Sequence, residues 1–250
     1  MMRGNDVMTK MVALLFAGAP MCVVNAADGD SWDWAIAPYL WAPSVGTNVH
    51  IDVPPINTGG TTQFADVASK LNFALLLHAE GQGDDYGVLS DIVYLSLSQT
   101  RHRDLFSTDI SQDVGLFELA GVWSPGETRH EGFEAFAGLR YLWGSLDLKI
   151  DPANAALEGA KISVDKSYAD FLIGARYTAK LSERWALTVR GDGSFGSTDG
   201  TYGASGLFQY QTSNGAWLFG YRYTKLKFGD NDRSVDVKLY GPEVGYAFKF

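Results

Sequence analysis

Cysteine is almost absent from this 250-residue chain, and the one that occurs, Cys22, lies in the N-terminal segment. Beyond that segment the chain can form no disulfide, which suits a protein that crosses an oxidising compartment before it folds. A lipoprotein would be acylated at Cys22, but Pro20 and Met21 in front of it fit the lipoprotein cleavage motif poorly. Proline is also scarce, with only 8 residues, and this favours a chain of strands and turns.

An excess of basic residues is also lacking. The formal net charge is −9 and no cluster of Lys and Arg occurs, so we expect no nucleic acid as a partner. Glycine-rich phosphate loops, metal-spaced Cys and His, His-Glu-x-x-His and Gly-x-Ser-x-Gly are all missing. The sequence therefore predicts no catalytic residue, no cofactor and no metal site, and we expect that the protein is not an enzyme.

Only one long apolar run is present, and it lies near the N-terminus. It spans residues 11–24, follows Arg3 and Lys10, and precedes the small residues Ala26 and Ala27. About fourteen apolar residues fall short of the ~20 that cross a membrane as a helix, so the pattern predicts a secretory signal peptide over residues 1–26, cleaved after Ala26 or Ala27. Residues 27–250 then form a single domain.

Alternating apolar and polar residues dominate the rest of the chain and predict strands. Each of the segments has 10 residues or more, as a tilted transmembrane strand needs (~9–11), whereas strands of soluble proteins average about 5–6. The fold class predicted is all-β, an antiparallel up-and-down transmembrane β-barrel of about ten strands. The range is 8–12 because residues 49–53, assigned to a loop, and part of 44–71 could themselves pair. The ten segments are 32–43, 73–82, 86–99, 110–124, 133–150, 168–181, 185–197, 202–211, 216–228 and 235–250.

The predicted connections differ between the two ends of this barrel. Short turns at 82–86, 182–184 and 213–215 alternate with longer loops such as 44–71 and 151–167. Bacterial outer-membrane barrels have this asymmetry, with the short turns in the periplasm.

The pattern Gly-x-Arg-Tyr occurs three times, at residues 138–141, 174–177 and 220–223. In a strand the Tyr and the second residue point one way and the Arg the other, so we expect apolar side chains to face lipid and charged ones to face the lumen. Charges in a narrow lumen must be paired or hydrated. The lumenal charges are interpreted as a ladder of salt bridges that fills the barrel, or alternatively as the lining of an ion-selective channel or a catalytic carboxylate pair. They are Arg140, Arg176, Arg190, Arg222, Glu80, Glu118, Glu134, Asp170, Asp192 and Glu243, with His78 beside them.

One strand, residues 86–99, leaves two alternatives open. Alternate side chains of this strand point to opposite faces, and the more apolar face contains Leu89, Val93 and Leu95. Asp91 belongs to the same face. Either a bulge shifts the register, or Asp91 faces inward and the lipid face is the weaker set that includes Tyr94.

The last eight residues carry alternating aromatic side chains and end in Phe250. Together with residues 37–41, the Gly-x-Arg-Tyr copies, 181–185, 190–192 and 241–250, they resemble a family of bacterial outer-membrane β-barrel proteins that are commonly called hypothetical or porin-like. The resemblance implies an outer-membrane location among lipids and lipopolysaccharide, and recognition by the barrel-assembly machinery during biogenesis. The residues that match the family's C-terminal assembly signal are Glu243, Gly245, Phe248 and Phe250.

The resemblance implies no catalytic residues. We therefore expect an integral outer-membrane barrel with a charged, largely filled lumen and a structural or surface-interaction role. The first alternative is a narrow channel for ions or small solutes. The second is a lipid-modifying enzyme that would use His102. The sequence names no solute and no surface ligand.

Overall fold

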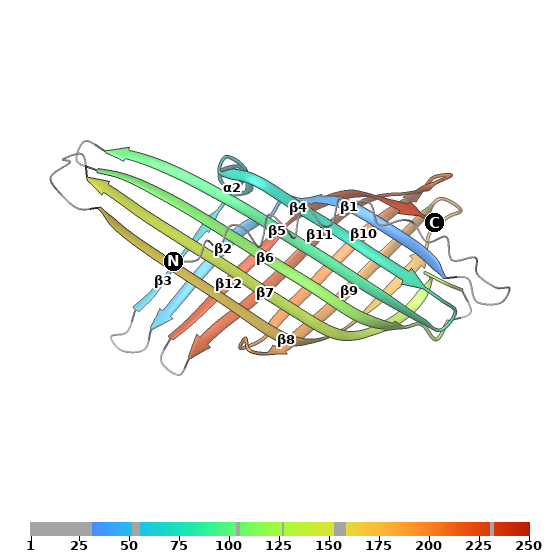
Figure 1. Ribbon diagram of the computed structural model, residues 1–250. Helices are drawn as coiled ribbons and strands as arrows, with labels where there is room; N and C mark the ends of the chain where they lie inside the picture. Colours follow the sequence, from blue (N-terminus) through green and yellow to red (C-terminus); the bar gives the residue numbers. More distant parts are fainter. Residues whose placement is uncertain (1–31, 52–55, 104–105, 127, 153–158, 231–232) are drawn as a thin grey trace, which may run out of the picture. The chain divides into compact units, whose positions relative to one another are not determined.

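Twelve strands and one short helix make up the computed structural model, which describes residues 32–51, 56–103, 106–126, 128–152, 159–230 and 233–250 (Figure 1). The helix is α2 (Phe64–Ala68). The strands are β1 (Asp33–Trp41), β2 (Ser44–Ile51), β3 (Ile56–Thr62), β4 (Leu71–Gln82), β5 (Tyr86–Arg103), β6 (Phe106–Trp123), β7 (Gly132–Pro152), β8 (Ala160–Lys180), β9 (Trp185–Gly196), β10 (Thr201–Gln211), β11 (Gly215–Asp230) and β12 (Arg233–Lys249).

Ten of the strands close into an antiparallel barrel. β1 and β4 to β12 pair in sequence order, and β1 also pairs with β12, which confirms the predicted fold. Residues 49–51, assigned to a loop, belong to β2, and β3 lies within 44–71, which confirms the alternative that these stretches pair; residues 52–53 lie outside the described chain. Both strands lie outside the closed ring. The cause is the length of β12: its C-terminal part pairs with β1, and its N-terminal part, from Arg233 to Tyr240, pairs with β2.

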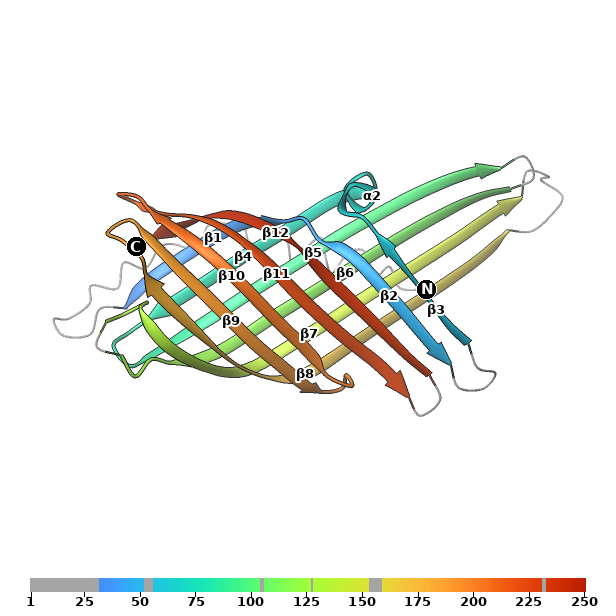
Figure 2. The same ribbon diagram turned by 180° about the vertical axis from the view of Figure 1, so that it is seen from behind.

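At one end of the barrel the strands themselves extend further, and they take up much of the sequence that was expected to form long loops. We call the end with the β4–β5, β6–β7, β8–β9 and β10–β11 turns the turn end, and the other the loop end. The predicted loop at 151–167 is largely strand, since β7 runs to Pro152 and β8 begins at Ala160. Polar pairs support this extension: Thr100 Oγ1 donates to Asp109 at 2.7 Å, and Lys161 lies 3.5 Å from Asp147. Figures 1 and 2 show β5 to β8 reaching well past the neighbouring strands.

The outer surface of the barrel carries an apolar belt. The Gly-x-Arg-Tyr copies expose Leu139, Tyr141 and Tyr177 among others, and the Arg of each copy is buried or half-buried. Aromatic rings gather at the turn end, where Trp185 and Tyr210 lie 5.0 Å apart between centroids. An apolar outer face with aromatic margins is the surface that a barrel presents to lipid. Within the described residues, no helix has the length and apolarity required to cross a membrane.

Candidate functional site

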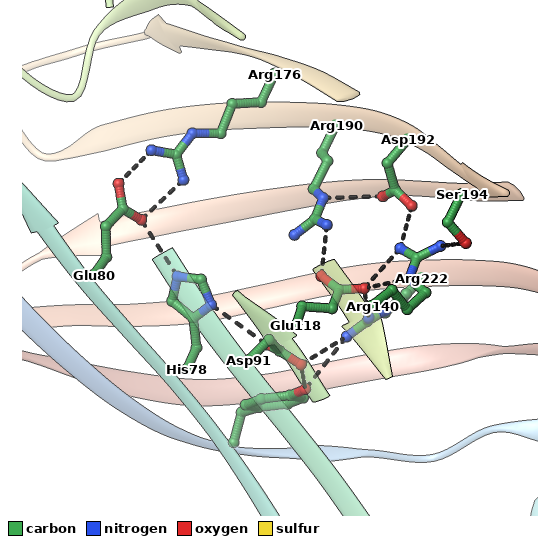
Figure 3. A network of polar contacts seen from close by, with 11 residues as sticks. His78, Glu80, Asp91, Glu118, Arg140, Arg176, Arg190, Asp192, Ser194 and Arg222 are labelled. Atoms are coloured by element: carbon green, nitrogen blue, oxygen red, sulfur yellow. Dashed lines mark hydrogen bonds and ion pairs between the residues drawn. The ribbon is translucent and has the colours of Figure 1, made fainter. Parts of the chain in front are cut away.

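The lumen holds a network of ion pairs centred on Glu118 (Figure 3). Arg140, on β7, donates from Nε and Nη2 to Glu118 Oε1 at 2.9 and 2.6 Å, and also contacts Asp192. Arg190, on β9, donates to Glu118 Oε2 at 2.8 Å and to Asp192 at 3.0 Å. Arg222 completes the group with Nη2 3.9 Å from Glu118. One fully buried carboxylate therefore lies among three guanidinium groups.

A second arm of the network lies on β4, β7 and β8. Arg176 donates to Glu134 at 2.6 Å and to Glu80 at 2.8 Å. Ser124 donates to the other oxygen of Glu134 at 2.8 Å. His78 connects this arm to β5, because its Nε2 lies 3.3 Å from Glu80 and its Nδ1 lies 3.3 Å from Asp91. The charges of the lumen are thus held mainly by one another.

Asp91 faces inward, which settles the alternatives left open by the sequence. The β5–β6 register is continuous and places Asp91 opposite Glu118, with Asp91 only 5% exposed. Tyr39 donates its hydroxyl to Asp91 at 2.9 Å, and Arg222 lies 3.6 Å from the same oxygen. The partner Tyr39 was not predicted. Its period-2 position with Ala37 and Trp41 on the inward face of β1 was the available signal.

Two of the ten predicted lumenal charges lie apart from these ion pairs. Asp170 is buried and accepts hydrogen bonds from the Ser194 hydroxyl and the Thr198 backbone N–H, each at 3.0 Å, so it anchors the β9–β10 turn. Glu243 faces the lumen, and among the described residues no hydrogen bond or ion pair reaches its carboxylate within the usual distances. The other eight are brought together in the network.

A cavity of about 650 Å³ opens at the turn end and reaches the network. Its wall combines rim residues such as Asp33 and Arg129 with the lumenal groups His78, Glu80 and Glu243. The cavity reaches Tyr39, Asp91 and Arg222 and, on β11, Thr224, and the apolar residues Trp41, Leu76, Val93, Leu116, Leu142 and Leu226 are not part of its lining. It is therefore open on one side of the network.

Those apolar residues form a layer on the loop side of the charges. Each lies on the same face of its strand as a charged or Tyr residue, two or four positions closer to the loop end, as Leu142 follows Arg140 and Leu116 precedes Glu118. We call this set the apolar layer: Trp41, Leu76, Val93, Leu116, Leu142 and Leu226, all less than 10% exposed. Arg222 lies over the Trp41 ring at 5.3 Å from its centroid, so the charged and apolar levels are in contact.

The C-terminal strand closes the barrel at the turn end. The Phe250 N–H donates to Trp34 O at 2.9 Å, and Phe248 is opposite Ile36 of β1. Phe248 and Phe250 face outward and are exposed, whereas Gly245 and Glu243 face the lumen. The predicted signal peptide (1–26) and the side chain of His102 lie outside the described part of the chain.

Comparison with solved structures finds bacterial outer-membrane barrels. The outer membrane protease OmpT from Escherichia coli matches with a TM-score of 0.51 at 7% identity, over 88% of this chain and 96% of that one. Ail, the attachment invasion locus protein of Yersinia pestis, crystallised with the heparin analogue sucrose octasulfate, gives a TM-score of 0.35 at 12% identity, covering 87% and 99% of the two chains. A Pseudomonas aeruginosa FadL homologue gives 0.35 at 7% identity, covering 88% and 90%.

No protein-family model matches the chain, and neither does any curated protein. The OmpT match, the closed ten-strand barrel and the apolar belt agree with one another. They confirm the fold implied by the resemblance of the sequence motifs. The chain is therefore a transmembrane β-barrel with the fold of the bacterial outer-membrane proteins.

Proposed function

We propose that this protein is a non-conducting outer-membrane barrel with a structural or surface-interaction role, in which the loop end is the working surface. The observation that carries the proposal is the double closure of the lumen. The ion-pair network around Glu118 and the apolar layer occupy successive levels, and the turn-end cavity stops between them. An ion would have to displace paired buried charges and then cross an apolar level, and both steps are costly.

The length of the strands supports a role for the loop end. β7 and β8 have 21 residues each, whereas about 9–11 residues suffice to cross the membrane. Roughly half of each strand therefore lies beyond the apolar belt. We propose that this part stands outside the cell, with its polar outer face among lipopolysaccharide head groups. Asp109, Asp147 and Lys161 contribute charges to that face.

Planar-bilayer conductance tests the proposal. The refolded mature protein should give no discrete current steps, because the two closed levels block ion passage. Flotation of vesicles made from the same sample shows whether the protein has inserted. Reproducible steps from inserted protein would contradict the proposal.

A narrow channel is the second candidate, and the charged 650 Å³ cavity that opens at the turn end favours it. If current steps occur, Arg190→Ala should change their ion selectivity, because Arg190 lines this cavity and pairs with Glu118. A selectivity that does not respond to this substitution would place the conducting path elsewhere.

We also propose that the last strand is the segment that the barrel-assembly machinery recognises. Phe250→Ala should lower the amount of protein in the outer membrane severalfold. The side chain of Phe250 is 70% exposed, so its loss should leave the stability of the refolded protein almost unchanged. Phe195→Ala, which removes an outward aromatic ring from β9, is the matched control. Equal losses for both variants, measured by blotting of membrane fractions, would contradict a role specific to the C-terminus.

A further inference from the structure

In the loop-end half of β5 to β8 the outward side chains are mainly polar and the inward side chains mainly apolar, the opposite of the arrangement nearer the turn end. The outward side of this half carries polar groups that pair across strands: Tyr94 donates to Asp113 at 3.1 Å, Ser145 to Asp113 at 3.4 Å, and Thr100 to Asp109 at 2.7 Å. Its inward side is apolar and solvent-exposed, a face that we call the inner apolar face. It includes Val114 (37% exposed), Leu146 (41%), Ile162 (53%) and Val164 (45%).

The inner apolar face continues without interruption into the apolar layer. Toward the loop end, Val114 is the next residue after Leu116 on the inward face of β6. On the inward face of β7, Leu146 lies beyond Leu142 in the same direction. The layer is thus the floor of a larger apolar surface. Contiguous exposed apolar surface of this kind marks a binding site rather than an ordinary solvated wall.

The strands across the lumen present apolar side chains toward the same space. Leu226 and Phe228 of β11 and Val237 and Leu239 of β12 belong to or pack against the apolar layer. Tyr168 of β8 meets Phe228 with ring centroids 4.8 Å apart, so the two sides touch at the floor. Beyond that contact β5 to β8 diverge from β2, β3, β11 and β12 in both views (Figures 1 and 2).

The strand ladder is interrupted beside this space. Within the described residues the β4–β5 ladder ends at Leu97, with one further backbone bond from the Ser98 N–H to Lys70 O at 2.8 Å, and β3 pairs only with β2. Beside the inner apolar face the described residues therefore form no continuous strand ladder between β3 and β5.

One cation lies on this mainly apolar surface, which also carries the inward side chain of Gln112 opposite Leu146. Lys166 occupies an inward position on β8, next to Val164 on the same face and opposite Gly144, which has no side chain to cover it. Of the inward side chains that the structure describes on the loop side of the apolar layer, Lys166 is the one that carries a charge. None of the ion pairs in the described residues includes Lys166. Lys166 thus lies between Val164 and Tyr168 on the inward face of β8, and a single cation bordered by apolar side chains complements an anionic head on an apolar tail.

We propose that the loop end binds one free fatty acid, with its carboxylate at Lys166 and its chain along Leu146, Ile162 and Val164. The proposal rests on the proposed function, because it names the ligand class of the loop-end surface. The two can nevertheless fail separately. Current steps would overturn the non-conducting barrel and leave fatty acid binding standing, whereas the experiment below measures binding alone.

Photolabelling tests the proposal on the mature protein in lipid nanodiscs. A 16-carbon fatty acid with a diazirine in its chain is irradiated with the protein, and the labelled residues are mapped by mass spectrometry. Label should appear on the inward residues of β7 and β8 and should fall at least fivefold when unlabelled palmitate is added in excess. Label confined to the outward belt, or not displaced by palmitate, would overturn the proposal.

Neighbouring residues on β8 provide matched variants. Val164→Glu should lower inward labelling at least fivefold and Ser163→Glu should not, because their side chains point to opposite faces of the strand. Lys166→Glu should weaken labelling severalfold and Lys161→Glu should not, since Lys161 pairs with Asp147 on the outer face. Gel mobility before and after heating verifies that each variant is folded.

Competition separates the fatty acid from other occupants. The methyl ester of palmitate should compete at least fivefold less well than palmitate, because it offers no charge to Lys166. Equal competition by the ester, displacement by phospholipid or lipopolysaccharide in place of palmitate, or a dimer in native mass spectra that blocks labelling would each overturn the proposal.

Discussion

Arg140→Ala should lower the free energy of unfolding by about 3–5 kcal/mol, the loss expected when one partner is removed from a buried ion pair. Arg140 is 1% exposed and donates to Glu118, which is fully buried, and to Asp192, whose side chain is 6% exposed. Its truncation leaves Glu118 with Arg190 and the more distant Arg222. Urea titration of the protein in vesicles, followed by tryptophan fluorescence, measures the change.

The control for this variant is Arg129→Ala, at the rim of the turn-end cavity. Arg129 contacts Asp84 at 2.6 Å and Asp33 at 3.4 Å, but both carboxylates are exposed to solvent. Exposed pairs of this kind contribute little to stability, so no measurable loss is expected. An Arg140→Ala protein that is as stable as the wild type but conducts ions would show that the charges line a channel and do not brace a closed barrel.

The sequence was sufficient to predict which charges face the lumen, because a strand has a side-chain period of two and Gly-x-Arg-Tyr repeats on three strands. It was insufficient for Asp91. The rule that the more apolar face of a strand meets lipid fails on β5, where Leu89 and Val93 face inward and pack in the lumen itself. An apolar level inside the barrel cannot be recognised from one strand alone.

Contacts between residues on distant strands could also not be predicted from the sequence. Arg140 and Asp192 are 52 residues apart, and only the complete register of β7, β8 and β9 brings them together. β3 was expected only as a possible pairing within 44–71, because Gly59, Gly60, Thr61 and Thr62 show no apolar alternation. β3 pairs with β2, and β2 pairs with the N-terminal part of β12, which β1 leaves unpaired. These strands depend on β12, whose residues are 182 to 196 positions away from their partners in β2.

Asp170→Ala should destabilise the barrel by about 3 kcal/mol, because hydrogen bonds to a buried carboxylate are worth about 1.5–3 kcal/mol each and their donors would be left unpaired. Asp170 is 2% exposed and accepts from Ser194 Oγ and Thr198 N at 3.0 Å, and also from the Thr198 hydroxyl. These bonds fasten the β9–β10 turn to β8. Urea unfolding in vesicles measures the loss, and faster proteolytic cleavage at the turn should accompany it.

Two further variants decide whether the loss arises from these bonds. Asp170→Asn keeps one acceptor oxygen and should therefore lie between Asp170→Ala and the wild type. Asp147→Ala removes a solvent-exposed carboxylate from the neighbouring strand, where Lys161 at 3.5 Å is a weak partner, and should leave the unfolding curve unchanged. Equal losses for Asp170→Ala and Asp147→Ala would mean that burial gives Asp170 no special role. If only the Asp170 substitution destabilises the protein, the short β9–β10 turn is held in place by the buried carboxylate of Asp170. This would explain how the turn keeps its position although the neighbouring strands β8 and β11 extend further toward the loop end.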